Sequence, residues 1–193
     1  KKNNISINAI CADYFMTKKL FNESKSELEK NIETMKKIIR QANKLEIVMI
    51  EIPFVDSSSL KNDENRKEII NNFKKILPIA EENNITLVLE TDLNPHDFKE
   101  FLTEFNHPGI MANYDSGNSA SLGYNSNEEL TELKKWIKNV HVKDRKFQGT
   151  TVPFGMGDTN FDLFFSSLSK IDYSGDLIIQ GARYKDKEIT PEK

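Results

Sequence analysis

The chain has 193 residues, of which 37% are hydrophobic and 30% are charged, which is ordinary for one soluble domain with a real core. The formal net charge of −3 argues against a dedicated nucleic-acid binder, because such proteins carry a basic surface. No apolar run is long enough to cross a bilayer, and the single cysteine, Cys11, excludes an intramolecular disulfide and fits a reducing compartment such as the cytoplasm.

Six short runs rich in Ile and Val alternate with amphipathic stretches along the chain. The predicted strands are Ile5–Ala12, Ile47–Pro53, Thr86–Glu90, Ile110–Asn113, Asn139–Lys143 and Leu177–Gln180. Strands that alternate with helices form parallel sheets, and strands of a parallel sheet are buried on both faces. The pattern therefore predicts an α/β fold with a parallel sheet.

The stretches between the strands carry signals for helix starts. Ser24–Glu27 and Ser126–Glu129 have the sequence of capping boxes, and Asn94-Pro95 places a cap residue before a first-turn proline. Pro78 lies inside a helical pattern, where proline removes a backbone donor and clashes with the preceding turn. We expect a kinked helix there.

A parallel sheet of this kind forms either an open doubly wound fold or a closed barrel. The glycine-rich motif of a dinucleotide fold is missing after the first strand, and the candidate site residues lie on successive strands. Both features favour the (β/α)8 TIM barrel. With about six strands present, the sequence predicts a partial barrel.

Three successive strands end on a residue that can bind a metal. Glu90, Asp115 and His141 follow one another at intervals of 25 and 26 residues. This is near the length of one strand-helix unit, roughly 30 residues when about 250 are divided over eight units. One ionisable group at a strand end often marks only a boundary, but three in succession indicate a shared site. Two carboxylates and an imidazole suit Mn, Mg, Co or Zn.

The segment Asp115-Ser116-Gly117-Asn118 has two interpretations that the sequence leaves open. The carboxylate of Asp115 either points into a central cavity, or it closes a local turn through its own backbone. Residues 118–124 are expected to form a lid-like loop.

The hexapeptide from Val140 to Arg145 contains four side chains that can bind a ligand or take part in catalysis. The alternation of a strand puts His141, Lys143 and Arg145 on one side. Facing a barrel lumen, they would offer a nitrogen ligand and two cations for a phosphate or a polarised carbonyl. The alternative, with His141 buried and both cations in solvent, is less favoured because cations within a strand core are costly.

Other segments carry weaker signals. Gln180 ends the last strand where a fourth ligand would fall, and Arg183 follows within reach of an anion. Glu51 is the weakest candidate, since it faces either the lumen or a helix-sheet boundary. A loop with Gly155 and Gly157 opens a helix, where it either attracts an anion or only turns the chain. His96 and His107 are expected at the surface.

Together these segments resemble the xylose-isomerase-like barrel superfamily, and in particular its bacterial sugar phosphate isomerase/epimerase proteins. The resemblance covers nearly the whole chain, and its most specific parts are Asp115–Asn118 and His141–Arg145. It also rests on further segments: Ile10–Met16, Pro53–Asp56, Leu89–Asp92, Ser119–Tyr124 and Thr151–Asp158.

The resemblance implies a site and a domain organisation. Members hold a divalent metal with Glu, Asp, His and Glu from late strands, which correspond here to Glu90, Asp115, His141 and Gln180. Related epimerases use the two glutamates as opposed bases, and Gln180 departs from that pattern. Residues 1–193 are expected to form one barrel domain that lacks the family's first two strands and last helix.

The expected function is that of a metal-dependent isomerase or epimerase of a sugar or sugar phosphate, acting through an enediolate. Glu90 is the expected base, Lys143 its electrostatic partner, and Arg145, Arg183 and Asn118 the substrate-binding residues. We expect a cytoplasmic protein of carbohydrate metabolism whose partner is a small molecule, a sugar or sugar phosphate. No nucleic-acid or membrane partner is expected, and the protein can form a homo-oligomer.

Two alternatives remain. A dehydratase or lyase of a sugar derivative needs the same proton abstraction on the same metal site but expels water. A non-catalytic partial barrel would bind a sugar or a partner protein, and Gln180 favours it. An abasic-site endonuclease is less favoured, because three histidines and an acidic chain do not provide a multi-metal cluster or a basic surface.

Overall fold

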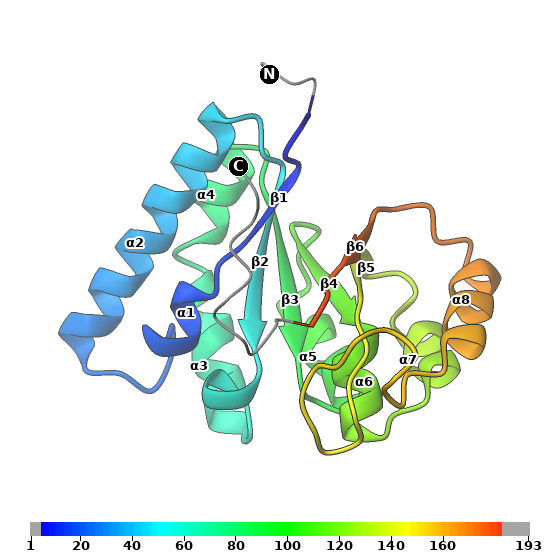
Figure 1. Ribbon diagram of the computed structural model, residues 1–193. Coiled ribbons are helices and arrows are strands. Elements are labelled where there is room, and N and C mark those ends of the chain that lie inside the picture. The colour runs from blue at the N-terminus through cyan, green and yellow to red at the C-terminus, as the bar shows by residue number, and fades with distance from the viewer. Residues whose placement is uncertain (1–4, 183–193) are drawn as a thin grey trace, which may run out of the picture.

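The computed structural model describes residues 5–182, which form a curved parallel sheet with helices along its outer side (Figure 1). All six predicted strands are present, in sequence order within one sheet and parallel to their neighbours: β1 Ala9–Cys11, β2 Met49–Phe54, β3 Thr86–Thr91, β4 Ile110–Asp115, β5 Ile137–Val142 and β6 Leu177–Ile179. A doubly wound sheet would reverse its strand order at a switch point. The unbroken order forms a half-barrel, and the predicted partial TIM barrel is confirmed.

Eight α-helices and one short 3₁₀ helix connect the described strands. They are α1 Tyr14–Thr17, α2 Lys25–Lys44, η1 Asp56–Ser58, α3 Asp63–Phe73, α4 Leu77–Glu82, α5 Pro95–Phe105, α6 Ser116–Leu122, α7 Ser126–Leu133 and α8 Phe161–Lys170. None of the helices in the described residues is both long and apolar enough to cross a membrane.

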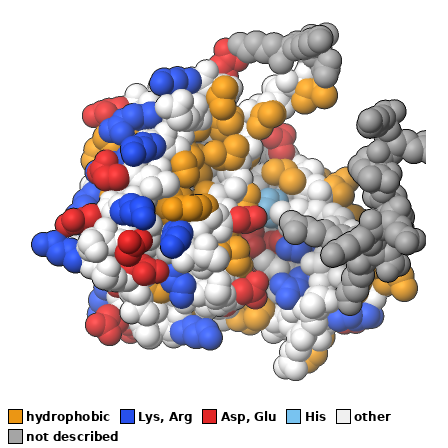
Figure 2. Space-filling model, turned by 60° about the vertical axis from the view of Figure 1, so that its left-hand side comes forward, with side chains coloured by type: hydrophobic (Ala, Val, Ile, Leu, Met, Phe, Trp, Pro, Cys, Tyr) orange, Lys and Arg blue, Asp and Glu red, His pale blue; other side chains and the backbone are white. Residues whose placement is uncertain are grey.

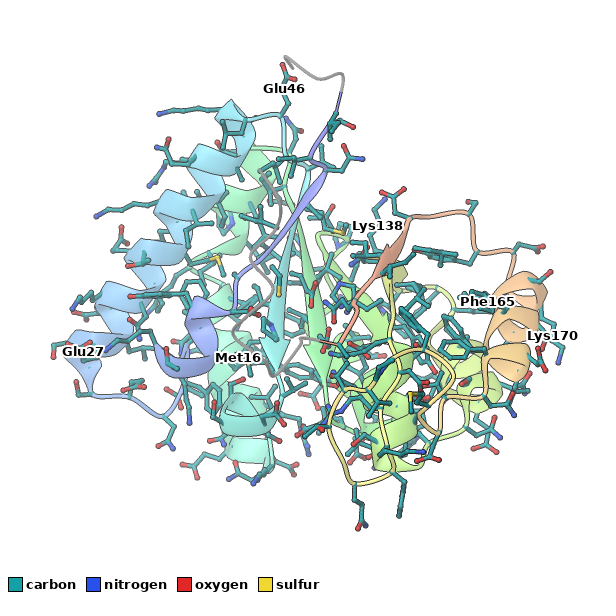
Figure 3. All side chains as sticks on the ribbon, in the orientation of Figure 1. Met16, Glu27, Glu46, Lys138, Phe165 and Lys170 are labelled. Carbon is teal, nitrogen blue, oxygen red and sulfur yellow. The ribbon has the colours of Figure 1, made fainter. Side chains whose placement is uncertain are left out.

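The core lies between the sheet and this helical layer. On α2, Ile32, Met35 and Ile39 repeat at helical spacing and are buried together with Phe54 of β2. Each such side chain contributes about 1.5–3 kcal/mol of hydrophobic stabilisation when fully buried. Charged residues on the opposite helix faces, such as Glu27, point outward (Figure 3).

Two of the predicted helix starts are confirmed. The side chain of Ser24 accepts a hydrogen bond from the amide of Glu27, and Asn94 accepts one from Asp97. The second predicted capping box is wrong, because Asn125 caps α7 and Glu129 turns into the interior. There the hydroxyl of Tyr114 donates to the Glu129 carboxylate.

Two other local predictions are corrected. The expected kink at Pro78 is a break: α3 ends at Phe73, and α4 starts with Pro78 in its first turn, where a missing amide proton costs nothing. The expected loop over residues 118–124 is mostly helical, since α6 runs to Leu122. It ends at Gly123, whose φ of 76° fits a left-handed helix terminus.

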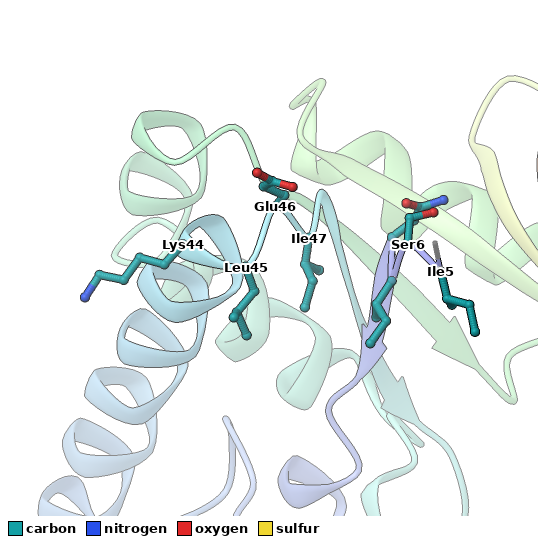
Figure 4. Close-up of a pocket in the computed structure, with 8 residues that line it drawn as sticks. Ile5, Ser6, Lys44, Leu45, Glu46 and Ile47 are labelled. Atoms are coloured by element: carbon teal, nitrogen blue, oxygen red, sulfur yellow. The ribbon is translucent and has the colours of Figure 1, made fainter. Parts of the chain in front are cut away.

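The half-barrel leaves apolar side chains exposed at both outer strands. Ile7, just before β1, is 64% exposed, and Ile179 of β6 is 73% exposed. Beside the first edge, residues 5–8 and 44–47 line a groove of about 800 Å³ (Figure 4). Hydrophobic side chains also gather in the upper part of the face in Figure 2. The open sides of the sheet are therefore partly hydrophobic.

Candidate metal centre

The three predicted ligand residues lie at the C-terminal ends of adjacent strands. Glu90 is near the end of β3, Asp115 ends β4, and His141 lies one residue before the end of β5. Asp115 and His141 are direct neighbours in the register of their two strands, so their side chains point to the same face. Gln180 follows β6. Its backbone N–H donates to the carbonyl of Val142 at 2.9 Å, which holds Gln180 beside the end of β5.

These side chains converge on Nδ1 of His141. This nitrogen lies 3.4 Å from Oε2 of Glu90, 3.8 Å from Oδ2 of Asp115 and 3.0 Å from Nε2 of Gln180. Figure 2 shows acidic side chains gathered beside a histidine on the face that it draws. The structure thus brings together all four residues expected from the sequence, while their role as ligands stays a prediction.

Glu51 of β2 is the site residue that sequence reasoning ranked too low. Its Oε2 lies 3.0 Å from Nε2 of His141, and both side chains are almost completely buried. Ligand atoms of Glu51, Glu90 and His141 all lie within 4.8 Å of one another. The sequence signal that could have identified Glu51 is a single charged residue between the apolar residues of a buried strand, because a buried charge is costly without a partner.

The buried charges of the centre shift one another's pKa values. Burial raises the pKa of Glu90 to about 8, despite its hydrogen bond with His141. Burial would also raise the pKa of Asp115, but His141 and Lys143 hold it below its usual value. Burial would lower the pKa of His141, but hydrogen bonds with Asp115, Glu51 and Glu90 raise it to about 11.

The donor set fits a divalent cation. Glu51, Glu90 and Asp115 are each at most 6% exposed, so three carboxylates face one imidazole away from bulk water. Lys143 contributes one positive charge, through Nζ at 3.0 Å from Oδ2 of Asp115. A site with carboxylates, an imidazole and an amide that can turn its oxygen inward matches Mn, Mg, Co or Zn.

Two asparagines orient the Glu90 carboxylate. Asn113 donates to Oε2 of Glu90 and Asn118 donates to Oε1, both at 2.5 Å. Arg145 in turn donates from Nη1 to Oδ1 of Asn118 at 2.7 Å, so a chain of contacts runs from a guanidinium to Glu90. Asn113 was not predicted, because a neutral amide within a strand carries no distinctive sequence signal.

The strand alternation after His141 turns out as expected. Lys143 and Arg145 are both half-buried and both contact site residues, so the alternative that placed them in solvent is wrong. Asp144 points the other way and is buried. Arg183 lies outside the described residues.

The glycine-containing loop does not present free amides to an anion. The amides of Gly155 and Gly157 each donate to Oδ2 of Asp144 at 2.8 Å, and the amide of Thr159 donates to Oδ1 at 3.2 Å. A carboxylate of the chain itself takes the place that an external anion could have had, which supports the interpretation of this segment as a turn. This arrangement ties the loop after β5 to the strand that carries His141.

The remaining histidines lie away from the centre. His96 is exposed and pairs with Glu100 at the surface, as predicted. His107, also predicted at the surface, is partly exposed there: its Nδ1 accepts from the amide of Gly109, and its Nε2 lies 3.1 Å from Glu81.

Comparison with known sequences gives one family and a set of epimerases. Residues 1–192 match the family described as xylose isomerase-like TIM barrel. A putative L-ribulose-5-phosphate 3-epimerase from Haemophilus influenzae is 29% identical over 95% of this chain and 69% of its own length. An L-ribulose-5-phosphate 3-epimerase from Escherichia coli O1:K1 is 25% identical over 91% of this chain. The chain spans only 64% of that second relative.

Comparison with solved structures supports the fold. A 3-keto-D-glucoside 4-epimerase from E. coli superposes with a TM-score of 0.75, at 15% identity over 96% of this chain and 75% of that one. A xylose isomerase-like TIM barrel protein from Mycobacterium smegmatis in complex with magnesium gives 0.73, at 15% identity over 95% and 69%. At such identities the likeness establishes the barrel architecture alone.

Proposed function

Because the chain belongs to the xylose isomerase-like TIM barrel family, we propose that it is a metal-dependent epimerase or isomerase of a sugar or sugar phosphate. The observation that carries the proposal is the convergence of Glu90, Asp115 and His141 at the C-terminal ends of β3, β4 and β5. Active sites of such barrels lie on this face. The two curated relatives named as L-ribulose-5-phosphate 3-epimerases favour a ketose phosphate as substrate.

Four residues would hold the metal in this proposal: Glu90, Asp115, His141 and Gln180. A bound divalent ion supplies Lewis-acid stabilisation for negative charge on adjacent carbonyl and hydroxyl oxygens of a sugar. The half-buried Lys143, which is paired with Asp115, adds positive charge at the same place. The protein would thus stabilise an enediolate.

Glu90 would remove the proton from the carbon next to the substrate carbonyl. A general base works best when its pKa lies near the working pH, and burial raises the pKa of Glu90 from its ordinary value toward that range. The hydrogen bonds from Asn113 and Asn118 hold its two oxygens in a defined orientation. Return of the proton to the same carbon from the other side gives an epimer, whereas return to the neighbouring carbon gives an isomer.

Two arginines that follow β5 and β6 in the sequence would bind the substrate. Arg145 contacts Asn118 and the carbonyl of Gly149, which fixes its guanidinium near Glu90. We assign Arg145, Arg183 and Asn118 to the phosphate or the terminal hydroxyls of the sugar. Arginine suits a phosphate because its planar fork makes two parallel hydrogen bonds.

Gln180 sets a limit on the mechanism. Its amide does not ionise, so it cannot act as a second carboxylate base opposite Glu90. The proposed reaction therefore relies on one base and favours transfer between adjacent carbons over inversion by two opposed bases.

Metal analysis of the purified protein followed by incubation in D₂O tests the proposal. We expect a bound divalent metal and deuterium at the carbon next to the carbonyl of L-ribulose 5-phosphate or a related ketose, detected by NMR. Loss of water from the substrate would indicate the dehydratase alternative, and sugar binding without deuterium uptake would indicate the non-catalytic one. A protein that neither binds a divalent metal nor exchanges protons on any ketose would overturn the proposal.

A further inference from the structure

We propose that Glu51 is a positioning residue of the metal centre. Its carboxylate accepts a hydrogen bond from Nε2–H of His141 and so turns the lone pair of Nδ1 toward the cation. The inference rests on the proposed function, because it assigns Glu51 a part in the same centre. It also explains why a carboxylate lies in the middle of a completely buried strand, β2.

The two ring nitrogens of His141 have different surroundings. Nε2 faces one oxygen of Glu51 at 3.0 Å. Nδ1 faces two side-chain amide nitrogens, Nδ2 of Asn113 at 3.2 Å and Nε2 of Gln180 at 3.0 Å. In this orientation both amide nitrogens can donate to a lone pair on Nδ1 when the ring is neutral. A neutral imidazole with its lone pair on Nδ1 carries its proton on Nε2, where Glu51 accepts it.

This tautomer is the one that a metal at the predicted position needs. The carboxylates of Glu90 and Asp115 lie on the Nδ1 side of the ring, at 3.4 and 3.8 Å. Histidines that bind metals generally donate their other N–H to a carboxylate or a carbonyl, which fixes the ring and raises the basicity of the ligating nitrogen. Glu51 has the position and the charge for this role.

Glu51 also restores charge that Gln180 does not provide. With an amide at the fourth position, Glu90 and Asp115 supply two negative charges directly. Glu51 adds a third through the imidazole, at 4% exposure and therefore with little screening by water. The centre thus has three carboxylates, one of which acts through His141.

The competing arrangement makes Glu51 a direct ligand. Its carboxylate, that of Glu90 and His141 lie close enough together for one ion. The metal would then bind Nε2 of His141 and Nδ1 would carry the proton. The ion would then lie on the side of the ring away from Asp115 and Gln180, whose contacts are with Nδ1. The observed contacts favour the positioning role.

Two substitutions of Glu51 separate charge from hydrogen bonding. Glu51→Gln keeps an acceptor oxygen and removes the charge, whereas Glu51→Met has a similar length and removes the acceptor. Glu129→Gln is the matched control, since Glu129 is a buried carboxylate that contacts Tyr114 and Ser119 rather than His141. Zn²⁺ is the probe, because it is diamagnetic and permits NMR of the histidine nitrogens.

We expect the wild type loaded with Zn²⁺ to show His141 protonated at Nε2 and bound through Nδ1. Removal of such a partner typically weakens metal binding by about 10- to 100-fold. By calorimetry, Glu51→Gln should weaken Zn²⁺ binding about tenfold and leave the tautomer of His141 unchanged. Glu51→Met should weaken Zn²⁺ binding about 100-fold. Glu129→Gln should bind Zn²⁺ as the wild type does.

Metal on Nε2, or undiminished Zn²⁺ affinity in a folded Glu51→Met, would overturn the positioning role. If Glu51→Met does not fold, the wild-type NMR assignment and the affinity of Glu51→Gln decide the question by themselves. A wild type that binds Zn²⁺ but exchanges no protons on ketoses would contradict the proposed reaction and leave the role of Glu51 intact. A wild type that binds no divalent metal would overturn both.

Discussion

Glu90 is the residue on which the proposed chemistry depends most. Glu90→Gln keeps the size of the side chain and removes the base, so proton exchange between a ketose substrate and D₂O should fall by about 10²- to 10⁴-fold. Gln180→Ala should instead weaken metal or substrate binding and leave most of the exchange rate at saturation. Deuterium uptake, measured together with metal content, checks both. An unmodified exchange rate in Glu90→Gln with its metal retained would exclude Glu90 as the base and point to Lys143.

The buried carboxyl group of Glu129 should make the stability of the protein depend on pH. Burial raises its pKa from 4.5 to about 7, although the hydroxyls of Ser119 and Tyr114 bind its charged form. Because the folded state holds this proton more tightly than the unfolded state does, the free energy of unfolding falls as pH rises from about 4.5 to 7. For such a shift the fall is about 3 kcal/mol. The unfolding free energy of Glu129→Gln relative to wild type should therefore increase by about this amount between pH 4.5 and 8.

Urea unfolding at both pH values measures this difference. Glu128→Gln is the control, because it removes the same charge from the neighbouring exposed position. The same relative stability for Glu129→Gln at both pH values would show that Glu129 is ionised throughout.

The sequence predicts site residues well where position along a strand carries the information. Glu90, Asp115 and His141 were identified because each lies at the end of an apolar strand at a regular interval. Glu51 was underrated because it lies in the middle of its strand, where the direction of a side chain follows from sheet register. The contacts of Asn113 depend on the curvature of the sheet in the same way.

At the scale of elements, the strands and most helix starts could be predicted, and the errors have local causes. Residues 118–124, which include most of α6, were expected to form a loop, and the helix starts with Ser116, Gly117 and Asn118, which have low helix propensity. It forms because Oδ1 of Asp115 accepts from the amide of Asn118, and because the hydroxyl of Ser116 donates to the carbonyl of Lys143. Tertiary contacts override propensity in this segment.

The loop between β5 and α8 depends on one carboxylate. Asp144→Ala removes the acceptor of three backbone amides, at Gly155, Gly157 and Thr159, and should destabilise the protein by about 2–3 kcal/mol. Cleavage within residues 146–158 should become faster in limited proteolysis. Asp158→Ala is the control, because Asp158 accepts from one amide at an exposed position. Equal cleavage of both variants would show that Asp144 does not hold the loop.

At the scale of the whole molecule, the open sheet exposes two edges with apolar side chains. Edge strands invite pairing with other chains, and a single lysine often prevents it. We expect the protein to associate as its concentration rises, and the double variant Ile7→Lys/Ile179→Lys to reduce this association in light scattering. The double variant Phe154→Lys/Met156→Lys adds the same two charges at exposed loop residues outside both edge strands. If it reduces association equally, the edges are not responsible.

The architecture follows from the alternation of strands and helices, while the curvature and the groove beside β1 do not. Residues 5–8 were expected to belong to the first strand, but the strand begins at Ala9. Pairing with β2 decides this boundary, and its register starts at Met49. Such long-range geometry has no counterpart in local pattern.

The two oxygens of Asp115 serve different parts of the molecule. Oδ1 accepts from the amide of Asn118 and starts α6, while Oδ2 faces Lys143 and His141. A ligand that fixes Oδ2 of Asp115 would therefore also fix Oδ1, and with it the first turn of α6. Amide hydrogen exchange in α6 should therefore slow when the centre is loaded, so that exchange in this short helix reports occupancy of the site.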